Sequence, residues 1–475
     1  MNEKITITEH VYKKKPKTPE EVEMDNKVLS EAFGEDYERK VNVDEDKLAA
    51  LKAKLAQKKQ ESQEVREDYL PEVVSKRSVS INMGILGVGQ AGSRIAEEFH
   101  RLGYDVGVIN TSAQDLEFID VLPSQKLLLT GSLGGTGKSL DLGREIFASH
   151  EEDLEDFVSK VADGNDMLFL AISGGGGSGS SSVDTMVDIM FRTGMPVGVI
   201  YVLPKATEDA QSKKNSIETL SRLARMTTGD MISSLVVVDN ARIEQIYNRL
   251  SQSQFWAKAN EAIVEPISLF NSLTSKPSKF TSLDPSDFGR IISAGDCSVY
   301  GVVDVEDYME ETSLAEAVID SLSGNMLAEG FDLSQTRVGG VIILGSEEAL
   351  SEMPSINIDY MFSVISEQTN GASIFQGVYS DESVEGIKIY SWFAGLGLPQ
   401  DRIDSLKKES KAQTEIAAGK EKSRASAMTL DLEENKVSSV KEEIERKIKS
   451  KNSGFNRLQG GGTKRDSIID KRRKR

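Results

Sequence analysis

The chain has 475 residues, a net charge of −19 and 38% hydrophobic residues, so its length predicts two domains with additional charged segments. Its single cysteine, Cys297, excludes a disulfide framework, and three scattered histidines argue against a Cys/His metal site. The acidic balance argues against a globally basic nucleic-acid binder, and the lack of a long apolar run predicts a cytoplasmic protein without membrane insertion.

Both ends of the chain are charged extensions by composition. Residues 1–78 are rich in charge and contain few aromatic residues, which predicts a helical or disordered N-terminal extension. Residues 399–475 form a second charged segment, with a flexible Gly-Gly-Gly at 460–462 and a basic tip, Lys-Arg-Arg-Lys-Arg. Such a tip can contact DNA or another anionic partner, although a plain solubilising tail has the same composition.

Residues 79–243 alternate between short apolar strands and amphipathic helices. Strands are expected at 79–89, 104–111, 125–131, 167–172, 196–204 and 234–240, and helices at 90–103, 142–161, 182–194 and 209–226. This alternation predicts a doubly wound parallel sheet whose ligand lies at the carboxyl ends of the strands.

The pattern changes after residue 243. Residues 244–280 predict a central helix region, with a break or bend near Pro266. Residues 281–398 predict a second, α+β domain, with strands at 296–306, 336–345, 372–380 and 386–396 and a helix at 313–327.

Three glycine loops follow strands of the first domain. Gly87, Gly89 and Gly92 match the G-x-G-x-x-G fingerprint of dinucleotide-binding proteins, which raises an NAD-dependent oxidoreductase as one hypothesis. The next strand ends at Asn110 and offers no acidic residue for a ribose, and no catalytic histidine, lysine or tyrosine group accompanies the loop.

The second loop, GSLGGTGKS at 131–139, resembles a Walker A loop but has the wrong spacing, so we reject a P-loop. The third, Gly174–Gly179, precedes a helix, where free backbone N–H groups and the helix dipole favour a phosphate. A flexible linker is the alternative, but the loop is flanked by a buried-type strand and an apolar helix. Several phosphate-type loops in one sheet favour a nucleoside triphosphate over a dinucleotide.

These loops, in this order, closely resemble those of the FtsZ/tubulin superfamily over about residues 80–400. GVGQAGSRI, NTSAQDL, GTGKSLDLGRE, GGGGSGS, LPKATED and VVVDNARI resemble successive nucleotide loops of that family. In GGGGSGS, Ser178 takes a threonine position, and Ser181, which follows this stretch directly, replaces the final glycine of the family's signature.

The resemblance implies a GTP/GDP site in which Glu208 binds ribose, Asn240 and Asn260 contact the base or sugar, and Trp256 packs on guanine. It implies the following nucleotide-binding residues: Gly87, Gly89, Gln90, Ala91, Gly92, Asn110, Gly135, Thr136, Gly137, Gly175, Gly176, Gly177, Ser178, Gly179, Ser180, Glu208, Asn240, Trp256 and Asn260.

SLDPSDFGRIISAG at 282–295 resembles the family's catalytic loop, with Asp284 and Asp287 at the two acidic positions. Considered alone, Ser282 or Asp284 could simply cap a helix. The other loops favour catalysis, in which one subunit's acids complete the next subunit's site in a head-to-tail homopolymer. Mg²⁺ would be held mainly by the phosphates of the nucleotide.

Two departures bear on base preference: Arg94 stands at an asparagine position of the family, and Ser212 at an arginine position. FAGLGLPQDRI and the basic tip are most like the TubZ branch of plasmids and phages. The resemblance therefore predicts a bacterial cytoplasmic GTPase filament that positions DNA, with a DNA-bound adaptor as partner. A non-hydrolysing scaffold and an FtsZ-like division protein are alternatives.

Overall fold

The structure, a computed structural model, describes residues 78–131, 134–323 and 327–428. The predictions for the N-terminal extension and for the basic tip therefore lie outside the described residues. The strands are β1 Met83–Val88, β2 Asp105–Asn110, β3 Lys126–Leu128, β4 Met167–Ser173, β5 Val197–Leu203, β6 Ser234–Asp239, β7 Cys297–Val305, β8 Val338–Gly345, β9 Ser373–Ser380 and β10 Ile387–Leu396.

The helices begin in the first glycine loop and end in the charged C-terminal segment. They are α3 Gly89–Arg101, α4 Ala113–Glu117, α5 Leu140–Ser149, α6 Glu151–Ala162, α7 Gly177–Arg192, α8 Ala210–Thr228, α9 Asn240–Ile246, α10 Gln252–Leu273, α11 Pro285–Ile292, α12 Ser313–Ser323, α13 Glu347–Glu352, α14 Ser355–Gln368 and α15 Gln400–Met428. Short 3-10 turns lie at Pro123–Gln125 and Leu333–Gln335.

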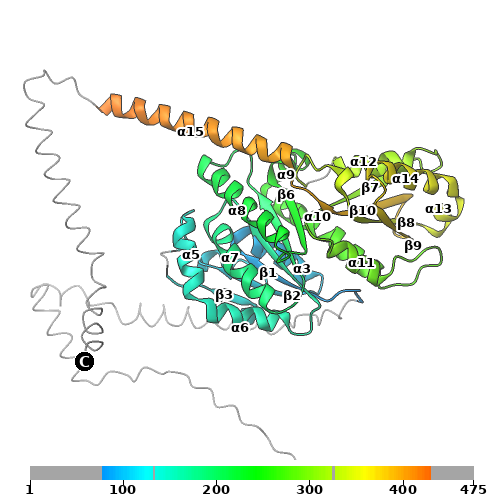
Figure 1. Cartoon of the computed structure of the whole chain (residues 1–475), viewed down its shortest axis with the longest axis horizontal. Helices are drawn as coiled ribbons and strands as arrows, with labels where there is room; N and C mark the ends of the chain where they lie inside the picture. Colours follow the sequence, from blue (N-terminus) through cyan, green and yellow to red (C-terminus); the bar gives the residue numbers. More distant parts are fainter. Residues whose placement is uncertain (1–77, 132–133, 324–326, 429–475) are drawn as a thin grey trace, which may run out of the picture. The chain divides into compact units, whose positions relative to one another are not determined.

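One ten-stranded sheet runs through the chain, in the order β3-β2-β1-β4-β5-β6-β7-β10-β8-β9 (Figure 1). Neighbouring strands from β3 to β7 are parallel, whereas β10 runs antiparallel to both β7 and β8. The α/β class and its mainly parallel sheet are thus confirmed. The two predicted domains share this sheet, and their boundaries remain a prediction.

The join between the two halves of the sheet is its shortest ladder in the described chain. Strands β6 and β7 are paired only at Leu235 with Cys297 and at Val236 with Ser298. By contrast, β8 and β9 are paired along their whole length, from Val338 to Gly345.

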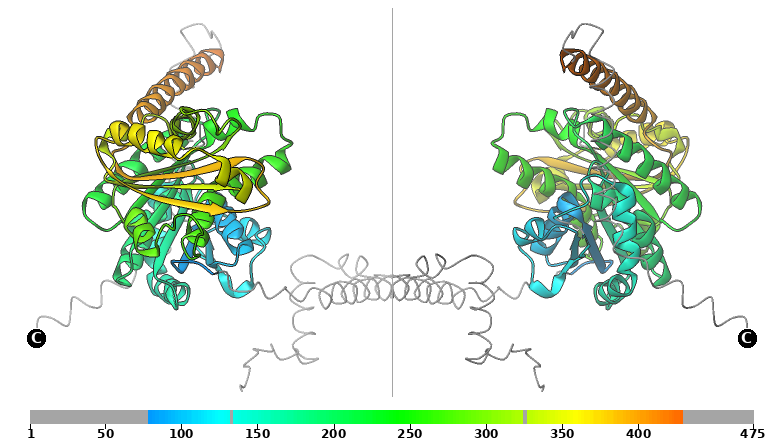
Figure 2. Two further views of the ribbon diagram at one scale, coloured as in Figure 1. Left: turned by 90° about the vertical axis from the view of Figure 1, so that its right-hand side faces the viewer. Right: turned by 90° about the vertical axis from the view of Figure 1, so that its left-hand side faces the viewer.

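Helices cover both faces of the sheet (Figure 2). Helices α3, α10 and α11 lie on one face, and α6, α7, α8 and α12 on the other. Strands covered on both faces must be apolar throughout, and every residue of β1, β5 and β6 is buried. The carboxyl ends of these parallel strands meet at one edge of the sheet, where the glycine loops begin.

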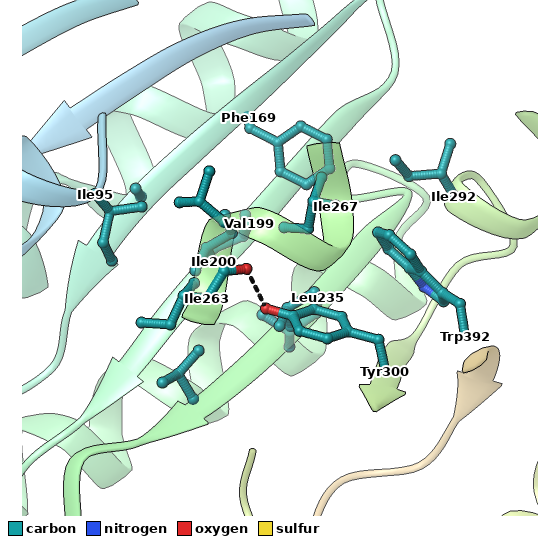
Figure 3. Packing of buried hydrophobic residues seen from close by; sticks show 14 of the residues in the cluster. Ile95, Phe169, Val199, Ile200, Leu235, Ile263, Ile267, Ile292, Tyr300 and Trp392 are labelled. Atoms are coloured by element: carbon teal, nitrogen blue, oxygen red, sulfur yellow. Dashed lines mark hydrogen bonds between the residues drawn. The ribbon is translucent and has the colours of Figure 1, made fainter. Parts of the chain in front are cut away.

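Helix α10 is anchored by aromatic side chains of the second half of the chain (Figure 3). The Tyr300 hydroxyl donates a 2.8 Å hydrogen bond to the main-chain oxygen of Ile263 on α10. The ring of Phe288, on α11, lies 6.0 Å from that of Phe270 on α10 and 5.8 Å from that of Trp392 on β10. These rings are fully buried, so they fix α11 against α10 and the sheet.

The predicted helix at 142–161 is wrong in one respect, because two helices meet at His150. This residue ends α5 and precedes α6, and its ring nitrogen lies 2.9 Å from the main-chain oxygen of Ile146. Glu151, Glu152 and Asp153 then occupy the first turn of α6, where the helix dipole favours negative charge.

The predicted break at Pro266 is also wrong. Helix α10 continues through this proline, and the chain breaks earlier, between α9 and α10. Ile263, Ile267 and Phe270 are buried on both sides of Pro266, so their packing outweighs the roughly 3 kcal/mol cost of a helical proline.

The segment after residue 398 begins with α15, although composition alone predicted only a charged tail. Ile403 and Leu406 are buried, and the half-buried Glu409, Ser410 and Gln413 continue the same helical face. Helices α13 and α14 were not predicted either.

Among the described residues, none of the helices combines the length and hydropathy that a membrane crossing requires.

Replacing Phe288 tests the aromatic anchor. Phe288→Ala removes a fully buried ring, so the free energy of unfolding should fall by about 3–5 kcal/mol in urea denaturation. Phe280, which is 41% exposed, provides the matched control, and Phe280→Ala should cost less than about 1 kcal/mol. Equal losses in the two variants would contradict the proposed anchor.

Candidate functional site

The first glycine loop brings strand β1 and helix α3 into direct contact. A Cβ atom on Gly87 would lie 2.3 Å from the oxygen of Gly92, and one on Gly92 would lie 2.0 Å from the oxygen of Ala171 on β4. Gly89 adopts a φ of +73° and lies beside the backbone of Gly179. Only glycine fits here, and the first loop therefore touches the third.

The third loop ends at Gly176, the N-cap residue of α7, so this helix starts five residues earlier than predicted. The N-cap has no side chain to satisfy the first backbone N–H groups of the helix. A Cβ atom on Gly177 would lie 1.8 Å from Thr136 Oγ1, and one on Gly179 would lie 2.9 Å from the oxygen of Ser173. Gly177 and Gly179 are thus packed against the Thr136 side chain and the end of β4, whereas Gly176 has open space beside it.

Two serines of this helix start have structural roles. Ser180 is fully buried, and its hydroxyl donates a 2.7 Å hydrogen bond to the oxygen of Gly174. Ser178 Oγ lies 2.8 Å from Thr111 Oγ1, at the end of β2. These bonds hold the loop against β2 and leave its backbone facing the carboxyl edge of the sheet.

Ser181, which departs from the family's glycine, is accommodated by a glycine on another helix. A Cβ atom on Gly143 of α5 would lie 2.1 Å from Ser181 Oγ. The hydroxyl of Ser181 donates to the oxygen of Ser178 at 3.2 Å, within its own helix. The larger side chain at 181 therefore depends on a bare backbone at 143.

The second glycine loop lies against the start of α7. Gly135 and Gly137 have positive φ values of 118° and 57°. Between them Thr136 is buried, and its hydroxyl has no hydrogen-bond partner in the described chain. A buried hydroxyl beside a free helix N-terminus is suited to an anionic ligand, because it leaves an unsatisfied donor there.

Lys138 completes this loop and was not among the predicted site residues. It adopts a φ of +67°, and its amine pairs with Asp209 and contacts Ser212 Oγ at 2.8 Å. Hydrogen bonding to Lys138 lowers the pKa of Asp209 below its usual value. A cation from the second loop thus reaches Ser212, the position at which the family resemblance led us to expect arginine.

Glu208 lies against the third loop. Its Oε1 accepts a 2.9 Å hydrogen bond from the backbone N–H of Lys205, and its Oε2 would lie 2.5 Å from a Cβ atom on Gly175. The carboxylate is thereby held beside the glycine backbone.

A cavity of about 780 Å³ adjoins these loops, between α3, α9 and α10. It is lined by Gln90, Ala91, Arg94, Ile95, Val202, Asn240, Ile243, Trp256, Ala259, Asn260 and Ile263. Five of these were predicted to bind nucleotide: Gln90, Ala91, Asn240, Trp256 and Asn260. Its apolar wall with a few amide groups suits an aromatic base.

Two positively charged side chains lie in or next to the wall of this cavity. Arg94, a departure from the family's asparagine, is one of the lining residues. The amine of Lys205 lies 4.7 Å from the ring centroid of Trp256 and 2.8 Å from Glu244 Oε1.

Asn110 has an internal role in the structure. It is 1% exposed, and its Oδ1 accepts a 3.1 Å hydrogen bond from the N–H of Ser112. Its amide nitrogen donates to Asp115 on α4 at 3.4 Å. The side chain therefore shapes the loop after β2, which holds Thr111 beside Ser178.

Asp284 and Asp287 lie at the start of α11, away from the glycine loops (Figure 1). Asp284 occupies the N-cap position, but its side chain accepts no capping hydrogen bond. Ser282 accepts instead from the N–H of Ser278, at 2.9 Å. The capping alternative is thus not realised, and the exposed Asp284 carboxylate makes no hydrogen bond or ion pair within the described residues.

Two family matches cover these loops and the acidic helix. Residues 82–248 match the GTPase domain of the tubulin/FtsZ family, and residues 270–407 match the C-terminal domain of TubZ-like proteins of that family. The chain belongs to the tubulin/FtsZ family.

Relatives come from more than one branch of the tubulin/FtsZ family. The tubulin-like protein CetZ of Pyrococcus horikoshii is 27% identical over 325 residues, which are 66% of this chain and 85% of CetZ. The tubulin-like protein TubZ of Bacillus cereus is 22% identical over 376 residues, 71% of this chain and 86% of TubZ.

The fold is also similar to that in a crystal structure of a GTPγS-form protofilament of Bacillus thuringiensis serovar israelensis TubZ. The TM-score is 0.65 at 18% identity, with 75% of this chain and 97% of that chain covered. This likeness supports the fold, whereas the roles of individual residues in this chain remain proposals.

Substituting Gly176 tests whether the third loop faces a ligand. A Cβ atom there meets only Ser173 Oγ, at 3.9 Å, so Gly176→Ala should change the free energy of unfolding by no more than about 1 kcal/mol. We expect its affinity for GDP to fall about tenfold or more in calorimetric titration, because the methyl group occupies space that a phosphate requires.

The control for this experiment is Gly419→Ala on α15, where a Cβ atom meets nothing within 4 Å. It should leave GDP affinity unchanged. Wild-type affinity in Gly176→Ala would show that this loop does not face the ligand.

Proposed function

We propose that this chain binds GTP, polymerises head to tail, and hydrolyses GTP at the junction between subunits. The observation that carries the proposal is the separation of the acidic pair from the nucleotide loops within one chain. Trp256, which lines the cavity, and Leu273, at the end of α10, are about 25 Å apart along the helix axis. Asp284 and Asp287 begin α11, which packs near that end through Phe288 and Phe270, so they cannot reach the glycine loops of their own subunit.

Head-to-tail stacking resolves this separation, because it brings the α11 end of one subunit to the glycine loops of the next. Hydrolysis then requires assembly, since a single subunit holds only half of each site. The TubZ relative of known structure was crystallised as a protofilament, which supports this arrangement for the present chain.

The glycine loops supply the phosphate-binding half of the reaction. Backbone N–H groups at the start of α7 bind and neutralise the phosphates, and the Thr136 hydroxyl donates to them. Glu208 orients the ribose, while Trp256, Asn240 and Asn260 hold the base. These contacts fix the terminal phosphate before attack.

The family resemblance also implies Mg²⁺. The described residues contain no group of three or more acidic, histidine or cysteine side chains able to hold a metal. When bound, a magnesium ion would be held mainly by the phosphates and water, and it would neutralise charge on the transferring phosphoryl group. The exposed carboxylate of Asp284, from the adjacent subunit, orients the attacking water, and Asp287 supports it.

The cellular role that we propose is the positioning of plasmid or phage DNA. The TubZ-like match at residues 270–407 supports it, as does the basic tip on a chain of net charge −19, which suits DNA or a DNA-bound adaptor. A different cytoskeletal role is the second candidate, since the CetZ relative is as similar to this chain in sequence as the TubZ relative.

Turnover measured against protein concentration tests the shared site. Wild-type GTP hydrolysis per subunit should rise above a critical concentration, whereas Asp284→Ala should lose at least about 100-fold in turnover while it still pellets with GTP. Asp359→Ala, an exposed acid on α14, is the matched control and should behave as wild type. Pelleting without turnover in the wild type would indicate a non-hydrolysing scaffold.

Lys138 provides a separate prediction about the terminal phosphate. Charge-assisted hydrogen bonds contribute roughly 1.5–3 kcal/mol, so Lys138→Met should weaken GTP binding by about 10- to 100-fold and GDP binding by much less. Lys214→Met, on the exposed face of α8, is the control. An equal loss for both nucleotides would exclude a role specific to the terminal phosphate.

A further inference from the structure

The first half of α15 packs against the loops that carry the proposed base and ribose contacts. Its buried face consists of Arg402, Ile403 and Leu406, and the C-terminal part of the helix projects away from the body (Figure 1). Residues 414–420 are exposed. The helix thus has a docked half and a free half.

Near the base-binding cavity, a side chain of α15 forms an ion pair with the last residue of β6. Arg402 Nε lies 2.6 Å from Asp239 Oδ2, and these two side chains are 8% and 2% exposed. The other Asp239 oxygen caps α9 by accepting a 3.0 Å hydrogen bond from the N–H of Ala241. Asn240 and Ile243, which line the cavity, follow directly, so Arg402 fixes the residue from which this wall of the cavity begins.

Removing Arg402 would leave a buried carboxylate without its cation. Burial raises the pKa of Asp239, and the charge of Arg402 opposes that rise. Without the guanidinium, Asp239 would take up a proton or turn toward water, and either change alters the N-cap of α9.

On the ribose side, three main-chain oxygens of the Glu208 segment accept hydrogen bonds. Gln413 Nε2 donates to the oxygen of Glu208 at 3.0 Å, and Ser410 Oγ donates to that of Ala210 at 3.3 Å. Lys213 Nζ donates to the oxygen of Ala206 at 2.6 Å. Two of the three donors belong to α15.

Glu409 forms ion pairs with both Arg402, which contacts Asp239, and Lys213, which binds the Glu208 segment. One of its oxygens lies 2.8 Å from Arg402 Nη1, and the other lies 3.0 Å from Lys213 Nζ. Partial burial raises the pKa of Glu409, but hydrogen bonds and charge from Lys213 and Arg402 lower it further, below its usual value. The carboxylate therefore stays charged and links the base-side pair to the ribose-side loop.

We propose that α15 is a positioning element of the nucleotide site, in which Arg402 acts through Asp239 on the base-binding wall and Gln413 acts through the Glu208 main chain on the ribose-binding loop. This inference rests on the proposed function, since it assigns a guanine nucleotide to the cavity. Because coupling between two binding events is reciprocal, docking of α15 strengthens nucleotide binding and bound nucleotide strengthens docking of α15. A partner that binds the exposed half of α15 and draws the helix away from the body would therefore lower the affinity for nucleotide.

Selectivity ratios separate positioning from a general loss of stability, because partial unfolding lowers all affinities together. Arg402→Met should lower the preference for GDP over ADP by about 5- to 10-fold while leaving the preference for GDP over 2′-deoxy-GDP unchanged. Gln413→Ala should show the opposite pattern. Arg402→Lys should partly restore base preference, because lysine keeps the charge but loses the guanidinium geometry.

The experiment uses the full chain at concentrations below assembly, with calorimetric titration of each nucleotide. Lys407→Met and Gln400→Ala, at exposed positions of α15, are the matched controls and should keep both ratios. Saturating GDP should also slow hydrogen exchange of the amides at 400–413 in the wild type. Because Gln413 is only half-buried, Gln413→Ala and the exchange measurement decide the matter even if Arg402→Met fails to fold.

Unchanged ratios in both variants, or unchanged exchange at 400–413 on GDP saturation, would overturn the positioning role alone. If the wild type bound no guanine nucleotide, the proposed function would fail and this inference with it. The two failures are therefore distinguishable.

Discussion

The candidate site depends on how closely bare backbone from three loops can approach at the carboxyl edge of the sheet. Gly87, Gly92 and Gly177 lie where any Cβ atom would enter neighbouring backbone or the Thr136 side chain. The close approach places the start of α7 beside two other loops, and the N–H groups of that helix start gain no side-chain cap. Glycine costs roughly 0.5–1 kcal/mol relative to alanine in regular structure, and this cost is offset by a surface that can hold an anion.

Helix α10 sets the distance between the nucleotide cavity and the acidic residues of α11. Its N-terminal half lines the cavity, while its C-terminal half is fixed to α11 and β10 by Phe270, Phe288 and Trp392. A rigid rod of this length keeps the acids and the glycine loops apart in one chain. The same rigidity gives each end a defined position relative to the other, so that identical subunits can complete one another's sites without rearranging.

The sequence predicted the strands well because their apolar runs are buried on both faces, and it located the glycine loops because glycine is so costly elsewhere. It did not reveal that both halves share one sheet, since the pairing of β6 with β7 leaves no local pattern. The continuity at Pro266 was missed because the packing of the buried residues around it outweighs the local preference of proline. The break at His150 follows a local signal instead, the three acidic residues that begin α6, which the apolar periodicity of the segment concealed. Arg402 and Gln413 lie in a segment of mainly charged composition, and only the spacing of Ile403 and Leu406 could have indicated a docked helix there.

The short ladder between β6 and β7 has a mechanical consequence. Elsewhere in the described sheet neighbouring strands share three or more paired positions, but at this seam β6 and β7 share two. Main-chain hydrogen bonds from Gly295 to Ser233 and from Ala328 to Val237 add to these pairs. Ser234 and Ser298 add one contact across the seam, with their hydroxyl oxygens 3.1 Å apart. Under tension or torsion the two halves would therefore shear at this seam more readily than at a longer ladder, so that elastic compliance is concentrated between the strands that carry the glycine loops and those of the second half.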